Sequence, residues 1–414
     1  MVRRRRFVQA WTLLAALGGL AACVADTGDA GYGRPAVVGA APAVDSLGRR
    51  VTILLPLTGS TAEIGQAMLR AAQLSLDQPG APPLDVRDTK GTPGGAAEAA
   101  KLAIAAGTGM LLGPLTAGET ASVAPLAKAA GIPVLAFTSD ASLAQPGVWA
   151  LGITPAQQVR RLVLALQAEG RSRLAAVLPS NAFGDAMASG VTAAAGTAGF
   201  AAPSVLRYGN GFAALNTALK SVSDYDARRS AAEQQAAPAP DDADTRRRPK
   251  EAGRPLPPPP IDALLLGTAG EQLGQALPLL TYYGIGPEQV RILGPALWGR
   301  DASRLSTLSG AWYAAPDPAQ RAPFEQAYAA KYNAPPRELA SLAYDAAAVA
   351  RVAADSGGFA PGPLTRPEGF TGADGLLGLQ PDGQTRRGLA IFEIDHGGSH
   401  VVQPAPQSLQ APGV

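Results

Sequence analysis

The stretch VTILLPL, residues 51–57, is the first run after residue 48 that is both apolar and rich in β-branched residues. Such a run predicts a strand that is buried on both faces of a parallel sheet. The turn residues 58–60 end the run, and residues 62–77 then carry apolar side chains at helical spacing. Because parallel strands need a crossover between them, this order predicts a strand–helix–strand unit and an α/β fold.

The same alternation of strands and helices continues in two series, and a chain of 414 residues is long enough for two lobes with separate cores. We expect each lobe to be a mostly parallel sheet with helices on both faces. In the first series the further expected strands are 84–87, 110–112 and 132–136, and the helices are 96–107 and 119–130. In the second series the expected strands are 174–178, 205–208, 261–266 and 290–293, and the helices are 157–170, 185–199, 213–222, 271–283, 324–333 and 339–355.

Residues 1–22 have the pattern of an export signal. Four consecutive arginines precede an apolar run at 11–20, which is too short to span a bilayer. The run ends in LAAC, which resembles a lipobox, so we expect cleavage before Cys23 and a lipid on its thiol. The alternative is an ordinary cleavage site beside an incidental cysteine. Because Cys23 is the only cysteine, the fold has no disulfide to rely on.

Two segments lack a regular apolar period. Residues 23–48 are rich in Gly, Ala and Pro, and we predict a flexible tether between the lipid and the folded part. Residues 226–260 combine mixed charges with four consecutive prolines, and we predict a disordered insertion within the second lobe. The alternative for this insertion is a docking segment for a partner. Near the end of the chain, Asp382-Gly383 lies between apolar runs at 376–379 and 389–394 and predicts a β-hairpin.

Several function classes are disfavoured by what the sequence lacks. The formal charge of +2 becomes −2 once the four leader arginines are removed, and no basic face is interleaved with aromatics, so we expect no nucleic-acid partner. The serine-nucleophile motifs SxxK and GxSxG and the glycine-rich phosphate loop do not occur. His396 and His400 lie in a Gly-Gly-Ser turn without the further ligands that a metal needs. We therefore expect no enzyme, no metal site and no cofactor.

Three motifs of the first series are LPLTG at 55–59, LGPLT at 112–116 and GIPV at 131–134. They resemble the opening of the leucine/isoleucine/valine-binding family, within the type I periplasmic binding protein superfamily. The resemblance implies a two-lobed fold in which the chain crosses between the lobes several times. The expected first lobe is 49–153 plus 298–358, and the expected second lobe is 154–297 plus 359–405.

Further motifs run through the rest of the chain: TKGTP at 89–93, FTSD at 137–140, GAWYAAPD at 310–317, LASLAYDA at 339–346 and GFTGADG at 369–375. These resemble the penicillin-binding protein activator family of lipoproteins, a closer match within the same superfamily. The resemblance covers roughly residues 50–405 and leaves the proline-rich insertion unmatched.

Ligands of open α/β lobes meet the loops at the carboxyl ends of strands, where helix N-termini offer free N–H groups. The side chains at these loops that are candidates for ligand binding are Thr116, Ser139, Asp140, Phe183, Thr268 and Trp298. The alternative is that Ser, Thr and Asp after a strand act as ordinary helix caps. By resemblance to amino-acid binders, an acidic residue for the ligand's ammonium is expected near 294–298, but none occurs there. A buried ammonium without a counter-ion would be costly.

The resemblance implies a non-enzymatic cell-envelope lipoprotein that contacts a peptidoglycan synthase, which is a penicillin-binding protein, or a wall-derived ligand. The alternative is the solute-binding subunit of an ABC importer for branched-chain amino acids or a similar small molecule. We expect membrane contact through the lipid alone. Val24 is not the aspartate that typically retains lipoproteins in the inner membrane, so we expect a periplasmic protein anchored in the outer membrane.

Overall fold

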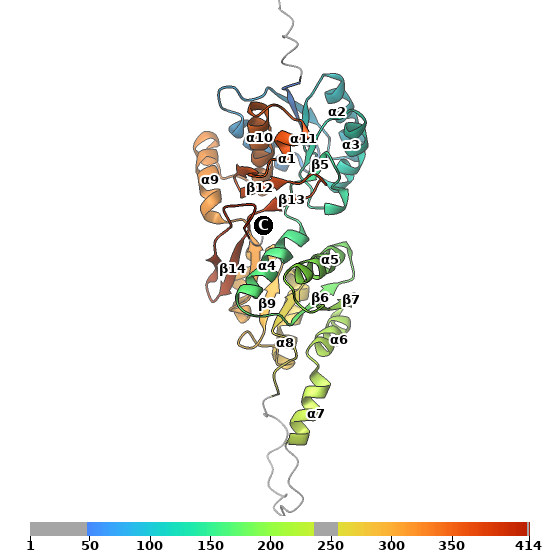
Figure 1. The fold of residues 1–414 in the computed structure, drawn as a ribbon, viewed down its shortest axis with the longest axis vertical. Coiled ribbons are helices and arrows are strands. Elements are labelled where there is room, and N and C mark those ends of the chain that lie inside the picture. The colour runs from blue at the N-terminus through green and yellow to red at the C-terminus, as the bar shows by residue number, and fades with distance from the viewer. Residues whose placement is uncertain (1–47, 236–255, 412–413) are drawn as a thin grey trace, which may run out of the picture. The chain divides into compact units, whose positions relative to one another are not determined.

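The computed structural model describes residues 48–235, 256–411 and 414. The predicted signal, the lipid site at Cys23 and the tether up to residue 47 lie outside the described residues. Within the described part the fold is α/β, as predicted from the alternating pattern. Two sheets are flanked by helices and a third, smaller sheet is antiparallel (Figure 1).

The first sheet has five parallel strands in the order β2-β1-β3-β4-β5. The run at 51–57 forms β1, and all five residues of this strand are buried. The strands are β1 (Val51–Leu55), β2 (Leu84–Asp88), β3 (Met110–Leu112), β4 (Val134–Ala136) and β5 (Val148–Ala150).

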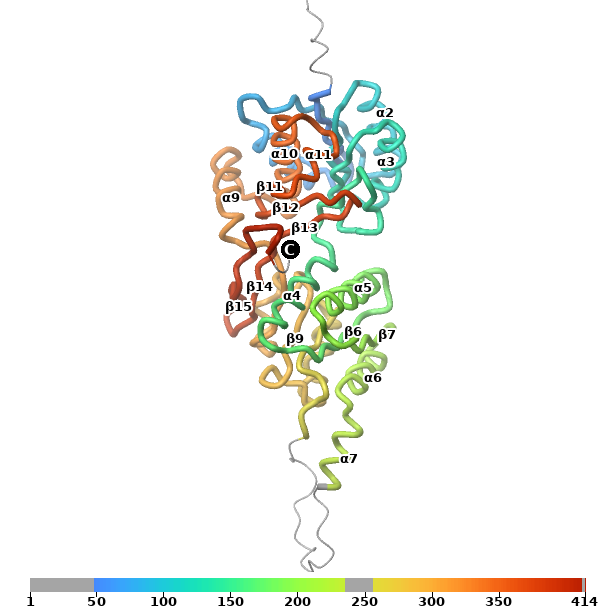
Figure 2. The backbone as a smooth tube through the Cα atoms, in the orientation of Figure 1, coloured from blue at the N-terminus to red at the C-terminus, as the bar shows by residue number. Residues whose placement is uncertain are grey.

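Helices cover both faces of the first sheet. Helices α1 (Ala62–Ser75) and α10 (Ala340–Asp355) share a core with one face, whereas α2 (Pro93–Ala105) and α3 (Ala117–Ala129) share a core with the other. Figure 2 shows α10, drawn in orange, beside the blue segments from the start of the described chain. The remaining helices of this part are α9 (Pro318–Tyr332), which packs on α1 and α10, and the short α11 (Pro361–Leu364).

The second sheet has seven strands in the order β15-β14-β10-β9-β8-β6-β7. Its strands are β6 (Leu174–Pro179), β7 (Ser204–Tyr208), β8 (Ala263–Leu266), β9 (Arg291–Gly294), β10 (Trp312–Ala315), β14 (Ala390–Asp395) and β15 (Gly398–Gln403). Only β14 and β15 are antiparallel to their neighbours. One face packs on α4 (Pro155–Ala168) and α5 (Ala182–Thr197), the other on α6 (Phe212–Val222) and α8 (Gly270–Tyr282).

The third sheet, β11 (Phe370–Gly372), β12 (Gly375–Leu379) and β13 (Thr385–Arg387), is antiparallel. The Asp382-Gly383 turn joins two antiparallel strands as predicted, but the strand after the turn is β13. The apolar run at 389–394, expected in this hairpin, instead provides β14 of the second sheet. Local turn chemistry therefore predicted the hairpin, whereas the partner strand depended on distant contacts.

The predicted division into lobes needs two corrections. Residues 312–315, assigned to the first lobe, form β10 between β9 and β14 in the second sheet. Residues 370–387, assigned to the second lobe, pack on α10, and Phe370, Leu377 and Leu379 share a core with β1. We therefore define the first lobe as β1–β5, α1–α3, α9–α11 and β11–β13. The second lobe is α4–α6, α7 (Tyr225–Gln235), α8, β6–β10, β14 and β15.

The predicted disorder of 226–260 is wrong at both ends of that segment. Tyr225–Gln235 forms helix α7, and residues 256–260 are packed nearby. Arg228 explains both, because its buried guanidinium donates to Pro257 O at 2.7 Å and to Tyr283 O at 2.7 Å. Arg228 thus joins α7 to Pro257 and Tyr283, and the composition of the segment could not indicate these contacts. Residues 236–255 lie outside the described part.

Candidate functional site

The loop after β3 uses Thr116 to begin helix α3. Its hydroxyl donates to Glu119 Oε2 at 2.9 Å and accepts from the Glu119 N–H at 3.3 Å. The other oxygen of Glu119 accepts the hydroxyl of Thr89 at 2.5 Å, and Glu119 is fully buried. This loop is therefore a capping box around a buried carboxylate, and the hydroxyl of Thr116 is already engaged. Glu119 was not among the predicted residues, although the Thr-x-x-Glu spacing was visible in the sequence.

The loop after β4 carries Ser139 and Asp140. It lies beside the loop of Thr116, to which a backbone hydrogen bond of 2.9 Å joins it. Both side chains are exposed. Asp140 Oδ1 accepts the N–H of Ser142 at 3.0 Å and its hydroxyl at 2.6 Å, and so begins a 3-10 turn. The structure thus gathers three predicted residues at one edge of the first sheet, and two of them act as caps.

Asp88, at the end of β2, organises the neighbouring loops. Its carboxylate accepts the N–H groups of Leu57 at 2.9 Å and Lys90 at 2.8 Å, and the hydroxyl of Thr58 at 2.7 Å. Burial opposes ionisation, but these hydrogen bonds together hold the pKa of Asp88 below its usual range. The ionised side chain therefore ties together the loops that follow β1 and β2. No sequence motif marked this residue.

Trp298 covers the carboxyl ends of β8 and β9 in the second lobe. Its indole N–H donates to Thr268 O at 2.7 Å, and each of the two residues is only 1% exposed. The indole lies flat against Gly294, where an added Cβ would meet ring carbons at 2.3 Å. Only glycine permits so close an approach. The structure thus brings the predicted residues Thr268 and Trp298 together, but Trp298 is a buried side chain that covers the strand ends.

The hydroxyl of Thr268 is buried and has no hydrogen-bond partner among the described residues. Thr268 precedes Ala269, the N-cap residue of helix α8, and Ala269 supplies no side-chain cap. The first N–H groups of an uncapped helix retain unused donor capacity. The start of α8 therefore keeps more unused hydrogen-bonding groups than the capped loops of the first lobe.

Phe183 lies in the first turn of α5, where it is half buried and packs against the core of the second lobe. The neighbouring Asn181 caps the helix by accepting the Gly184 N–H at 2.9 Å. Gln158 of α4, which was not predicted, accepts the Ala296 N–H at 2.8 Å and so positions the turn that carries Trp298. No nearby residues in the sequence could indicate this contact, because Gln158 lies far from the turn along the chain.

Two cavities lie away from the predicted ligand residues. One of about 350 Å³ is mainly apolar and lies beside the end of α8; its lining includes Leu277, Leu280, Ile285, Ile292 and Leu308. The other, of about 410 Å³, lies beside β2 and α2; its lining includes Arg87, Asp88, Lys90, Glu98 and Leu102. Neither cavity includes any of the six candidate residues.

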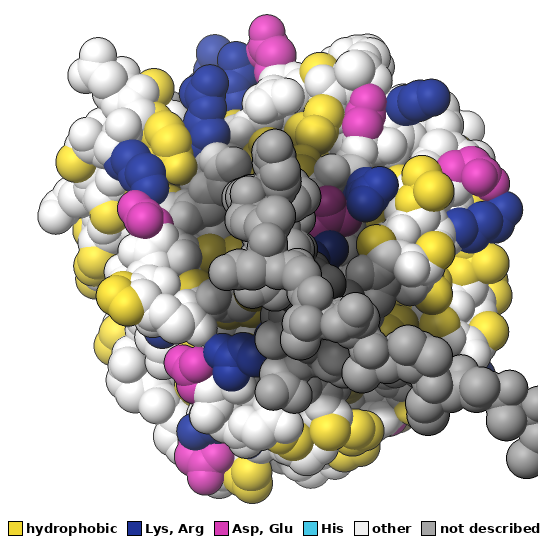
Figure 3. All heavy atoms as spheres, turned by 90° about the horizontal axis from the view of Figure 1, so that it is seen from above, with side chains coloured by type: hydrophobic (Ala, Val, Ile, Leu, Met, Phe, Trp, Pro, Cys, Tyr) yellow, Lys and Arg dark blue, Asp and Glu magenta, His cyan; other side chains and the backbone are white. Residues whose placement is uncertain are grey.

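Clusters of metal ligands and membrane-spanning helices are absent from the part of the chain that the structure describes. In the described ranges, no three His, Cys, Asp or Glu side chains are grouped closely enough to hold a metal ion. No helix between residues 48 and 411, leaving aside the undescribed 236–255, is long and apolar enough to cross a membrane. In the face drawn in Figure 3, basic, acidic and apolar side chains are interspersed outside the grey residues.

Comparison with known proteins adds a family. Residues 49–399 match a family model described as periplasmic binding protein. No curated protein matches the chain by sequence. The fold is similar to that of a putative branched-chain amino acid ABC transporter from Rhodospirillum rubrum, with a TM-score of 0.64 and 18% identity over 85% of this chain and 99% of that one.

The fold is also similar to that of LpoA from Haemophilus influenzae. For the full-length protein the TM-score is 0.62, with 15% identity over 86% of this chain and 59% of that one. For its C-domain, described as a regulator of PBP1A, the TM-score is 0.60, with 16% identity over 85% of this chain and 99% of that one. At these identities the likeness is one of fold, and the same fold occurs in a regulator and in a transport protein.

Proposed function

The chain belongs to the periplasmic binding protein family, and from this premise we propose a non-enzymatic cell-envelope protein that contacts a peptidoglycan synthase. The synthase would be a penicillin-binding protein, as for the relative described as a regulator of PBP1A. The observation that carries the proposal is the position of Trp298. A small ligand in an α/β lobe must reach the polar groups at the strand ends, and here an indole occupies that place.

The chemistry of the first lobe supports the same proposal. The hydroxyl of Thr116 and the carboxylate of Asp140 are engaged in caps within the chain. An amino-acid ligand also needs a counter-ion for its ammonium, and residues 294–298 supply none. A protein partner needs no such pocket, because it binds an outer surface with many small contacts.

The proposed location is the periplasm, with the chain held by a lipid on Cys23 and anchored in the outer membrane. The lipobox and the identity of Val24 motivate this location. Replacing Cys23 with Ala should release the protein from the membrane fraction into the soluble periplasm. Retention of the variant in outer-membrane fractions would contradict the anchor.

The proposed partner can be tested by affinity purification from detergent-solubilised envelopes with the full chain as bait. We expect recovery of a peptidoglycan synthase, identified by a fluorescent penicillin, and no recovery with an importer's binding protein as the control bait. Repeated recovery of other envelope proteins without a synthase would contradict the proposal.

The second candidate function is the solute-binding subunit of an importer. The observation that favours it is the buried hydroxyl of Thr268, which has no partner in the described part of the chain and lies near the start of α8, which lacks a side-chain cap. A thermal-shift screen with amino acids distinguishes the two, since a ligand at 100 times its dissociation constant adds about 2.7 kcal/mol of stability. A shift with the native chain favours the importer. A shift that appears only in Trp298→Ala identifies the indole as the group that closes the site.

A further inference from the structure

After β15, the last strand of the second sheet, the chain returns to the first lobe. Residues 404–411, which we call the C-terminal strap, contact α4 of the second lobe, the start of α9, and the third sheet. Three other segments pass between the lobes, at 151–154, at 316–317 and at 388–389. The strap is thus a fourth connection.

Polar contacts fasten the strap to two of the three crossings. The Ala405 N–H donates to Asp317 Oδ2 at 3.0 Å, while Asp317 Oδ1 accepts the Ala319 N–H and begins α9. Arg161 of α4 donates to Leu389 O at 2.8 Å and also reaches Pro404 O at 3.4 Å. Both Asp317 and Arg161 are buried. Each of these side chains therefore holds a crossing and the strap at once.

The end of the strap near Leu409 is held by close packing against glycines. Leu409 is buried over two glycines of the first lobe, where an added Cβ would meet its methyl groups at 2.7 Å on Gly369 and at 2.6 Å on Gly378. At the third crossing, a Cβ on Gly388 would meet Pro406 O at 2.7 Å. Three glycines thus leave room for the strap, which indicates that this segment is packed into the fold rather than resting on it.

We propose that the C-terminal strap restrains the crossings, so that the lobes do not hinge freely about them. Closure of two-lobed proteins requires a few residues in the connecting segments to change φ and ψ. Here Asp317 is hydrogen-bonded to the strap, and Leu389 shares the guanidinium of Arg161 with it, while the strap itself is anchored in both lobes. The inference concerns the conformational freedom of the chain and holds whichever partner or ligand the protein has.

The test is hydrogen–deuterium exchange of the full chain, compared with a chain ending at Gln403 and with Leu409→Ala. We expect amide exchange at Asp317 and in 388–389, the two crossings that the strap contacts, to rise at least about tenfold in both variants, because local opening there becomes easier. Exchange in β1 and β6, within the lobe cores, should stay unchanged. Leu102→Ala, the same substitution at a leucine that is 56% exposed, is the matched control and should change neither region.

The Asp317→Asn variant distinguishes the contact of Asp317 with the strap from its role as the N-cap of α9. Asparagine keeps one acceptor for the Ala319 N–H but sets an amide group against the Ala405 N–H, so exchange at the crossings should rise while α9 stays protected. This variant also decides the case if the shortened chain does not fold. Unchanged exchange at the crossings in folded Leu409→Ala and Asp317→Asn, or an equal rise in the cores, would overturn the proposal.

Discussion

Two arginines of this protein, Arg387 and Arg291, each bind carboxylates and a backbone carbonyl, but in opposite surroundings. Arg387 at the end of β13 and its partner Asp345 on α10 have side chains that are 0% exposed. Arg291 at the start of β9 lies near the surface, 16% exposed, between Glu169 and Glu393, which are 27% and 30% exposed. The same pair of chemical groups is thus a core element in one lobe and a surface network in the other.

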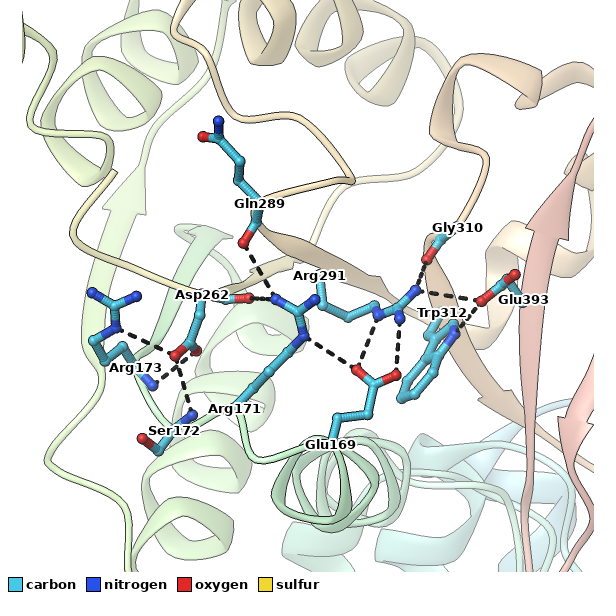
Figure 4. A network of polar contacts seen from close by, with 10 residues as sticks. All are labelled: Glu169, Arg171, Ser172, Arg173, Asp262, Gln289, Arg291, Gly310, Trp312 and Glu393. Atoms are coloured by element: carbon cyan, nitrogen blue, oxygen red, sulfur yellow. Dashed lines mark hydrogen bonds and ion pairs between the residues drawn. The ribbon is translucent and has the colours of Figure 1, made fainter. Parts of the chain in front are cut away.

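The partners of the two arginines differ as well. Arg387 donates twice to Leu151 O, at 3.1 and 3.0 Å, and once to Asp345 at 2.9 Å, so it holds the first crossing of the chain. Arg291 donates to Glu169 and Glu393, stacks 4.3 Å above the ring of Trp312, and belongs to the network drawn in Figure 4. Water can replace partners in the surface network but cannot reach the buried one. Burial therefore decides how much the loss of each arginine lowers the free energy of unfolding.

The largest expected effect is that of Arg387→Met. It removes the partner of the Leu151 carbonyl and the counter-charge of the buried Asp345 carboxylate, which keeps the Ala373 N–H at 2.6 Å, so the free energy of unfolding should fall by about 3–5 kcal/mol. Urea denaturation of the full chain measures the change. Arg387→Lys keeps the positive charge but loses the planar, two-pronged donor geometry of the guanidinium. The free energy of unfolding of this variant should lie between those of the wild type and Arg387→Met. A loss below about 1 kcal/mol in the methionine variant would contradict the comparison.

The next effect is a pH dependence. Burial raises the pKa of Asp345 to about 6, although Arg387 opposes this and the charge of Asp374 adds to it. The folded protein thus holds this proton more tightly than the unfolded chain does. The stability that this carboxyl contributes is therefore present near pH 4 and is lost as the pH rises through about 6.

The comparison of wild type with Asp345→Asn isolates this titration. The free energy of unfolding of the wild type minus that of the variant should decrease by about 2–3 kcal/mol from near pH 4 to near pH 7. Denaturation curves at several pH values measure the difference. A difference that stays constant or increases with pH would show that Asp345 titrates near its ordinary value.

A smaller effect is expected for Arg291→Met at the surface network. The variant loses two ion pairs, the stacking on Trp312 and a hydrogen bond to Gly310 O, which together should cost about 1–2 kcal/mol. Part of this loss should disappear in about 1 M salt, because exposed charges are screened. An effect as large as that of Arg387→Met, independent of salt, would remove the distinction between the two regions.

The smallest effect is expected for Arg173→Ala, at the edge of the same network. Arg173 is 63% exposed and pairs with Asp262 at 3.3 Å. Its removal should change the free energy of unfolding by less than about 0.5 kcal/mol. Thermal denaturation is sensitive enough to decide, and a loss above about 1 kcal/mol would mean that the network acts as one cooperative unit.

Much of the candidate site was visible in the sequence, but not what its residues do. Thr116, Asp140, Thr268 and Trp298 stand at strand ends as predicted, because the turn after a strand is marked by nearby residues. Whether a hydroxyl there is free or engaged depends on its neighbours in space. The Thr-x-x-Glu pattern indicated the engagement of Thr116, whereas nothing near Trp298 indicated that its indole would lie on Gly294.

The alternation of buried strands and amphipathic helices, the α/β class and the position of most elements followed from patterns that repeat within a few residues, and the family followed from the resemblance of motifs along the chain. The sheet joined by 312–315, the place of β11–β13 and the ordering of 225–235 and 256–260 were decided only in the tertiary structure. The physical reason is the range of the interactions. A helical period or a turn is specified by neighbours, whereas Arg387 finds Leu151 across 236 positions of the chain, through a contact that exists only once distant segments of the first lobe have come together.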